Sequence, residues 1–305
     1  MTDRLYPGQM LFARARRRLR AIAVAAGAVA TVALISTSSA GAISTAEREE
    51  FLPFATCPFS QAVLCISSTT TGGEFVIGEM KKAVPLSKPI LIQGGLAENL
   101  VRRQPLIAPT SGEAVAKVPE EVPGGLVGVL NLGGEVTATA ELVGPVSEVK
   151  ISQIALAAPG LAGPAVIIPL KVHLQNELLG EDCYIGSDTE PIVLHLTTGN
   201  TSPPEGTEPI KGFEGEGEVL KKGKKTLITT IKNTKLVDND FAVPAAKGCG
   251  GEEEGLIDKL VNLDIGLPAA AGKNSATMIA SLSESTTEFV EKYLPKKKKE
   301  KKAKA

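Results

Sequence analysis

The sequence has few of the side chains that most often carry catalysis or stack on ligands. Its 305 residues include two histidines, three tyrosines and no tryptophan. Two histidines are too few for a histidine-rich metal centre, and the scarcity of large aromatic rings disfavours the platforms on which sugars or single-stranded bases stack. Hydrophobic residues nevertheless make up 43% of the chain, which is enough to form a core. The composition therefore predicts a folded protein with few catalytic side chains.

The N-terminus has the three parts of a secretory signal peptide. An arginine cluster at residues 14–20 precedes an apolar, alanine-rich run of 15 residues from Ala21 to Ile35. Small residues follow, and Ala40-Gly41-Ala42 fits a cleavage motif. The apolar run is shorter than the roughly 20 residues that a spanning helix needs. We therefore expect residues 1–42 to be a cleaved signal peptide; the alternative is an uncleaved N-terminal membrane anchor.

Charge is unevenly distributed along the chain. Residues 43–294 carry 20 basic and 32 acidic side chains, a net charge of −12, whereas residues 295–305 hold seven lysines and one glutamate. An acidic body repels phosphate backbones, so we expect no nucleic-acid partner. The tail is expected to be disordered, because its like charges repel and nothing in it can be buried. A solubilising end is the favoured interpretation, and the alternative is a weak contact with an anionic surface through Lys296, Lys297, Lys298 and Lys299.

The chain has an even set of four cysteines, Cys57, Cys65, Cys183 and Cys249. In a chain bound for an oxidising compartment, this set predicts two disulfides, with three pairings open. We favour Cys57 with Cys65 and Cys183 with Cys249, because the first two are close in sequence and Pro58 favours a turn between them. A zinc site is the competing interpretation, but the sequence has no CxxC pair of the kind that holds structural zinc.

Strand-like alternation dominates residues 51–243. Apolar and polar residues alternate with a period of two in many short segments, and Gly or Pro separates them. The clearest examples are residues 135–142, 168–174 and 192–196, and the lysine-rich segment 221–225 is typical of a hairpin tip. Strands with one apolar and one polar face belong to antiparallel sheets. The pattern predicts a mainly β fold, either an antiparallel sandwich or a barrel-like domain.

Two segments near the C-terminus depart from the strand pattern. Residues 253–263 place their aliphatic side chains on one helical face, and residues 287–294 can form a short helix after a strand-like run. Residues 199–217 are rich in Pro, Gly and Glu and predict a flexible excursion, which lies inside the expected loop between Cys183 and Cys249. We therefore expect a single β-rich extracytoplasmic domain over residues 43–294, with one or two short C-terminal helices.

Three stretches carry a family resemblance. LLGEDCYIGS, PIVLHLTTGNTSPP and LVDNDFAVPAAKGCGG are similar to an uncharacterised family of secreted proteins of actinobacterial type, which the Arg/Ala-rich leader also fits. The resemblance covers most of residues 51–290. It implies export and a bridge between Cys183 and Cys249, and it implies no activity and no catalytic residue.

The two histidines are the main candidates for a polar site. His173 and His195 lie on the polar sides of neighbouring predicted strands, whose antiparallel pairing could bring the imidazoles together. A metal or acid-base site needs a third member, and Glu177, Glu181 and Asp182 are nearest in sequence. We favour two separate, partly exposed histidines, because nothing in the sequence fixes their geometry. The GxSxG, HExxH and P-loop signatures are absent, so no catalytic residue is assigned.

Oxygen ligands suited to Ca²⁺ occur in two acidic segments, Asp238-Asn239-Asp240 and residues 252–254. The ligand spacing and the glycine of an EF-hand are absent, so a solvated turn is the favoured interpretation. We therefore expect no metal and no cofactor.

These features together favour a secreted or cell-envelope protein with a non-catalytic structural or binding role. If the partner is a small molecule, an apolar ligand between the sheets is favoured over a sugar, because the strands supply aliphatic walls and few aromatic platforms. An envelope component is the other partner considered. The alternative function is a secreted hydrolase with an unrecognised site, which predicts a cleft where His173 or His195 meets carboxylates.

Overall fold

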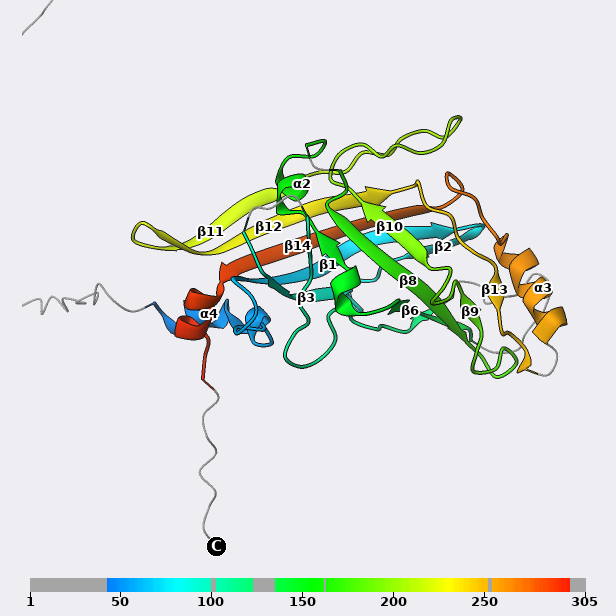
Figure 1. Cartoon of the computed structure of the whole chain (residues 1–305), viewed down its shortest axis with the longest axis horizontal. Helices are drawn as coiled ribbons and strands as arrows, with labels where there is room; N and C mark the ends of the chain where they lie inside the picture. The colour runs from blue at the N-terminus through cyan, green and yellow to red at the C-terminus, as the bar shows by residue number, and fades with distance from the viewer. Residues whose placement is uncertain (1–42, 100–102, 123–134, 162, 252–253, 297–305) are drawn as a thin grey trace, which may run out of the picture. The chain divides into compact units, whose positions relative to one another are not determined.

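The body of the chain folds into two antiparallel β-sheets (Figure 1). The computed structural model describes residues 43–99, 103–122, 135–161, 163–251 and 254–296. The predicted signal peptide and nearly all of the basic tail lie outside these residues. Within them, no helix is both long and apolar enough to cross a membrane. The expected mainly β, antiparallel fold is confirmed.

The first sheet is centred on two long strands, β1 and β14. Its strands are β1 (Leu64–Ile77), β2 (Met80–Ala83), β3 (Leu91–Leu96), β11 (Glu216–Lys222), β12 (Lys225–Asp238) and β14 (Ser275–Thr286). The order across the sheet is β11-β12-β14-β1-β2, and β3 pairs with the first half of β1. Leu64 pairs with Thr286 and Val76 with Ser275, so the first and last strands of the domain lie side by side.

The second sheet is centred on β8. Its strands are β4 (Gln104–Pro105), β5 (Glu120–Glu121), β6 (Thr137–Leu142), β7 (Lys150–Ile151), β8 (Val166–Gln175), β9 (Tyr184–Ile185), β10 (Ile192–Leu196) and β13 (Ala246–Lys247). The main order is β13-β9-β8-β6-β5, while β10 and β7 also pair with β8. The predicted antiparallel pairing of the segments around residues 168–174 and 192–196 is therefore present as β8 and β10.

The two sheets pack face to face as an open sandwich (Figure 1) and bury one continuous hydrophobic core. The buried residues of the two central strands are Val166, Ile168, Val172 and Leu174 of β8 and Ala276, Met278 and Ala280 of β14. They alternate with more exposed residues, as expected for strands with one face toward a core. An isolated pairing of Thr197 with Val237 joins the end of β10 to β12. Within the described chain the sheets otherwise remain separate layers rather than a closed barrel.

Short helices flank the sandwich. They are α1 (Thr45–Glu49), η1 (Leu52–Phe54), η2 (Val146–Glu148), α2 (Gln153–Ala157), α3 (Glu254–Ile265) and α4 (Thr287–Tyr293). Both C-terminal helices, α3 and α4, match the predicted segments. The helices α1 and α2 were not expected, since five residues complete little more than one turn and leave no helical period to detect. Their caps specify them instead: the Ser44 hydroxyl accepts from Glu47 N, and the Ser152 hydroxyl accepts from Ala155 N.

The predicted excursion at residues 199–217 folds back along itself. Its two arms are joined by hydrogen bonds from Thr201 N to Ile210 O and from Gly212 N to Gly199 O. The returning arm then pairs Phe213 with Lys235 of β12. The excursion is thus attached to the edge of the sandwich, inside the single domain.

The predicted cysteine pairs are formed. Cys57 is bonded to Cys65, and Cys183 to Cys249. Both bonds are buried, and the second joins the chain just before β9 to the chain just after β13, two strands that pair with each other. Two buried structural disulfides indicate an oxidising, extracellular environment.

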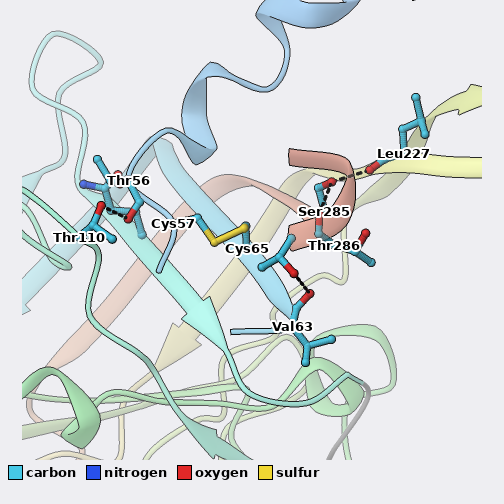
Figure 2. Close-up of a disulfide and its surroundings, with 10 residues drawn as sticks. Thr56, Cys57, Val63, Cys65, Thr110, Leu227, Ser285 and Thr286 are labelled. Atoms are coloured by element: carbon cyan, nitrogen blue, oxygen red, sulfur yellow. Dashed lines mark hydrogen bonds between the residues drawn. A yellow bond between two sulfur atoms is a disulfide. The ribbon is translucent and has the colours of Figure 1, made fainter. Parts of the chain in front are cut away.

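The first disulfide lies in a second, smaller core at one end of the sandwich (Figure 2). The buried members of this core are Ile43, Phe51, Phe54, Cys57, Cys65, Leu227, Ile228, Val290 and Tyr293. The rings of Phe51 and Tyr293 lie 5.6 Å apart, and the Ser285 hydroxyl donates to the carbonyl of Leu227 at 2.7 Å. The start of the described chain, the part of the β11–β12 hairpin next to its turn and the last helix therefore pack together.

We predict that the two disulfides differ in their contribution to stability. They close loops of 8 and 66 residues, which in the chain-entropy model correspond to about 2.5 and about 4 kcal/mol. Replacing Cys183 and Cys249 by alanine should lower the free energy of unfolding by about 1–2 kcal/mol more than replacing Cys57 and Cys65. Urea unfolding of both double variants measures this difference. Equal losses, or a larger loss for the short loop, would contradict the entropic account.

Candidate functional site

An apolar cavity of about 170 Å³ lies between the two sheets. Its walls include Phe75, Ile77 and Met278 from the first sheet and Ile168, Leu170 and Leu194 from the second. The space exists because small side chains occupy several facing positions, among them Ala138 and Ala140 of β6. The apolar positions of residues 135–142 already carry this signal in the sequence, since alanine on an inward strand face fills less volume than the valine or leucine beside it.

Polar groups gather where the edge strands of the two sheets approach each other at the cavity. Lys82 of β2 donates to the carbonyl of Glu121 at 2.7 Å, and its Nζ lies 3.4 Å from Glu120 Oε2 on β5. Lys88 donates to the carbonyl of Pro119 at 2.9 Å. Two lysines from the first sheet side thus reach across to the β5 segment of the second. They form a polar rim beside an otherwise aliphatic cavity.

Glu120 has one carboxylate oxygen without a partner in the part of the chain that the structure describes. Its Oε2 faces Lys82, but its Oε1 is buried and receives no hydrogen bond there. A buried acceptor left unpaired costs about 1–3 kcal/mol, and more when it is charged. Because Glu120 lines the cavity, a rotation of its side chain would turn this buried oxygen toward a hydrogen-bond donor on a molecule held inside.

A smaller hollow of about 40 Å³ continues between the sheets toward Glu284 of β14 and shares Ile92 and Met278 with the larger cavity. Burial raises the pKa of the Glu284 carboxyl, and a hydrogen bond from Gln153 Nε2 at 2.7 Å partly offsets this rise. The carboxylate is thus held in an environment that favours its protonated form. Nothing in the sequence pattern singled out this residue, since it lies among alternating polar residues at the end of a strand.

The structure separates the two histidines. His195 pairs with Ile167 of β8, six residues along that strand from His173, which corresponds to about 20 Å at about 3.3 Å per residue. The His173 ring stacks on Tyr184 with centroids 4.4 Å apart, and its Nε2 lies 2.8 Å from the backbone carbonyl of Glu181. The side chains of Glu181 and Asp182 are exposed. The four residues therefore do not converge on one site.

A wider, more polar hollow of about 930 Å³ contains His195 and Asp238. Here the carboxylate of Asp238 is buried and already accepts from two backbone N–H groups, those of His195 at 2.6 Å and Asp240 at 2.8 Å. Its role is to hold the chain, so the expected solvated turn is buried and hydrogen-bonded at Asp238 and Asn239, and only Asp240 is exposed. Among the described residues no cluster of three or more His, Cys, Asp or Glu side chains is arranged to hold a metal ion.

One spacing that is typical of some serine hydrolases does occur in the sequence. Ser147 and Lys150 stand in the order Ser-x-x-Lys, in which a lysine can activate a serine nucleophile. In the structure Ser147 is exposed on η2, and Lys150 Nζ donates to its backbone carbonyl rather than to its hydroxyl. Lys150 also lies 4.0 Å from Glu148. The arrangement is a surface turn and lacks the contact that would activate the hydroxyl.

Comparison with known proteins adds no relative. No family model matches the chain, and no curated protein or solved structure matches it either. The resemblance to secreted proteins of actinobacterial type therefore stays a prediction. The site has to be interpreted from its own geometry.

We predict that removing the buried charge of Glu284 stabilises the protein in a pH-dependent way. Because the pKa of this carboxyl is raised in the folded state, binding of its proton favours folding. This contribution to the free energy of unfolding is complete below the ordinary pKa of 4.5 and is lost as the pH rises through the folded-state pKa. Glu284→Gln should therefore raise the midpoint of thermal unfolding by roughly 2–4 °C at pH 7 and by much less at pH 4.

The matched control is Glu177→Gln, which removes one charge from an exposed position. Thermal unfolding of both variants is followed by circular dichroism at the two pH values. If the gain from Glu284→Gln is the same at pH 4 and pH 7, or no larger than that of the control, desolvation of Glu284 is not the cause.

Proposed function

We propose that the chain is an exported, non-catalytic binding protein that holds a small apolar molecule between its two sheets. The cavity lined by Phe75, Ile168 and their aliphatic neighbours carries this proposal. Binding there removes apolar ligand surface from water against walls that are already formed, which is the main source of affinity in such sites. The two buried disulfides support export, and cleavage near Ala42 would give the mature protein.

The size of the cavity limits the ligand. Sites for drug-sized molecules usually measure about 300–1,000 Å³, whereas an apolar cavity of about 150 Å³ is known to hold benzene. At about 170 Å³ the present cavity matches the second case. We therefore infer a ligand with one ring or an alkyl segment of comparable size.

The rim of the cavity adds a polar preference. Among the described residues Glu120 Oε1 has no hydrogen-bond partner, so a ligand that carries a hydroxyl can donate to it once this side chain turns toward the cavity. A hydrogen bond to a charged group contributes about 1.5–3 kcal/mol, of which the loss of ligand hydration cancels a part. An apolar body with one donor at its end fits this combination of walls and rim.

We predict that filling the cavity abolishes binding. Toluene and p-cresol should bind the wild-type protein with Kd values of about 0.1–1 mM, equivalent to roughly −5.5 to −4 kcal/mol. Ala138→Leu places three more carbon atoms on the cavity wall and should weaken both affinities at least tenfold. Ligand-observed NMR gives the Kd values, and circular dichroism establishes that the variant is folded.

The control for this change is Ala271→Leu, a partly exposed alanine that does not line the cavity. It should bind both compounds like the wild type. Absence of toluene and p-cresol binding to the wild-type protein, or unchanged binding to folded Ala138→Leu, would refute the proposed site.

We predict that Glu120 selects for the hydroxyl group. The wild-type protein should prefer p-cresol to toluene by about tenfold, which corresponds to about 1.4 kcal/mol. Glu120→Leu should remove this preference and leave the affinity for toluene unchanged, because its ion pair with Lys82 is partly solvent-exposed and contributes little to stability. An equal preference in both proteins would show that Glu120 does not contact the ligand.

Export is tested separately from binding. Native mass spectrometry of the protein recovered from the medium and from the envelope fraction reports the mature N-terminus and the number of free thiols. We expect a chain that starts at Ile43, has no free thiol and carries a small co-purifying molecule. A chain that retains residues 1–42 in both fractions would instead support the N-terminal anchor.

A further inference from the structure

Four lysines project at the tip of the β11–β12 hairpin. The turn consists of Gly223 and Lys224, and Gly223 has φ +61°, a conformation that glycine adopts without steric cost in a tight hairpin. Lys221 and Lys225 flank it, and both are exposed, as is Lys224, while Lys222 is half-buried. Four like charges meet at one turn, and the two strands hold that turn at the end of the first sheet (Figure 1).

The hairpin contacts the last helix of the protein. Lys222 Nζ lies 3.4 Å from the Tyr293 hydroxyl and 5.4 Å from the centre of its ring, and Lys225 Nζ lies 5.9 Å from the Phe289 ring. Lys292 and Arg48 also lie within 6 Å of the Tyr293 ring centre, at 5.5 and 5.8 Å. These cation–π contacts gather positive charges from the hairpin, α1 and α4 around two aromatic rings.

The basic tail begins at the same place. Lys296, which is exposed, follows α4 by three residues, and the sequence then continues with further lysines to residue 304. We name the basic pole as the set Arg48, Lys221, Lys222, Lys224, Lys225, Lys292 and Lys296. Glutamates on α1 and α4 offset part of this charge, so the attraction comes mainly from the projecting hairpin tip. Away from the pole the body is strongly acidic.

We infer that the basic pole binds an anionic phospholipid bilayer. A planar surface meets only the projecting end of the molecule, where the lysines lie, whereas a long polyanion that followed the protein surface would meet the acidic body. Two exposed aliphatic side chains, Leu52 and Val63, lie on segments that pack against α4 and its neighbours, and such side chains favour the lipid interface. The pole would thus place the protein on a bilayer independently of any ligand in the cavity.

The inference is tested by sedimentation with lipid vesicles. The wild-type protein should sediment with vesicles of one part phosphatidylglycerol to two parts phosphatidylcholine, and not with phosphatidylcholine alone. Binding should be lost when the salt is raised from about 0.1 M to about 1 M, because the screening length falls from about 10 Å to about 3 Å. Each lysine near the surface is expected to contribute about fivefold, the equivalent of about 1 kcal/mol.

The test variant replaces Lys221, Lys222, Lys224 and Lys225 by glutamine and should bind at least tenfold more weakly. A second variant, Lys221→Gln with Lys224→Gln, spares the two lysines that contact Tyr293 and Phe289 and should bind at least fivefold more weakly. The control replaces four exposed lysines elsewhere and should bind within about twofold of the wild type. Its positions are Lys211, Lys247, Lys259 and Lys273.

Three results would overturn the inference. Wild-type affinity in both hairpin variants, while they are folded, would show that the hairpin lysines do not make the contact. Equal binding of the wild type to neutral and anionic vesicles would exclude an electrostatic contact. Retention of double-stranded DNA without sedimentation on anionic vesicles would identify a soluble polyanion as the partner.

Discussion

The need to bury the apolar faces of two sheets against each other governs this structure. Each central strand exposes its polar side chains on one side and must place its aliphatic side chains against a partner layer. The β8 and β14 residues that meet in the core satisfy this requirement by close packing. On the inward face of β6, alanines stand where larger side chains would fill the space between the sheets, and the cavity is the result.

The energetic cost of each charged group around the core depends on how exposed it is to water. Lys82 and Glu120 lie where the edge strands of both sheets meet water, so their ion pair costs little desolvation. One oxygen of Glu120 is nevertheless buried and has no partner within the part of the chain that the structure describes. Glu284 shows the opposite case, since burial between the sheets raises its pKa. The polar groups that bear on function are therefore found at the margins of an apolar interior, and none of them forms an acid-base pair with a histidine in the described chain.

The second core lies at one end of the sandwich and makes that end different from the rest of the domain. It ties the first described residues, the turn end of the β11–β12 hairpin and α4 into one unit around the Cys57–Cys65 bond. This unit holds the lysines of the hairpin tip beside the start of the basic tail. None of the residues that line the cavity belongs to the second core or to the basic pole, so ligand binding and surface attachment can be altered separately.

Local pattern in the sequence determined the strands, the two C-terminal helices and the favoured pairing of Cys57 with Cys65, because a period of two, a helical face and a short separation between cysteines are properties of nearby residues. The pairing of Cys183 with Cys249, 66 residues apart, followed only as the remaining pair. Tertiary structure alone decided which strands became neighbours. The pairing of β1 with β14 joins opposite ends of the domain, and the registration of β10 on β8 separates His195 from His173. The cavity, the free oxygen of Glu120 and the contact of Lys222 with Tyr293 depend on those pairings. Volume and burial between sheets arise from residues that are distant in the chain, and the alternation within any one strand does not encode them.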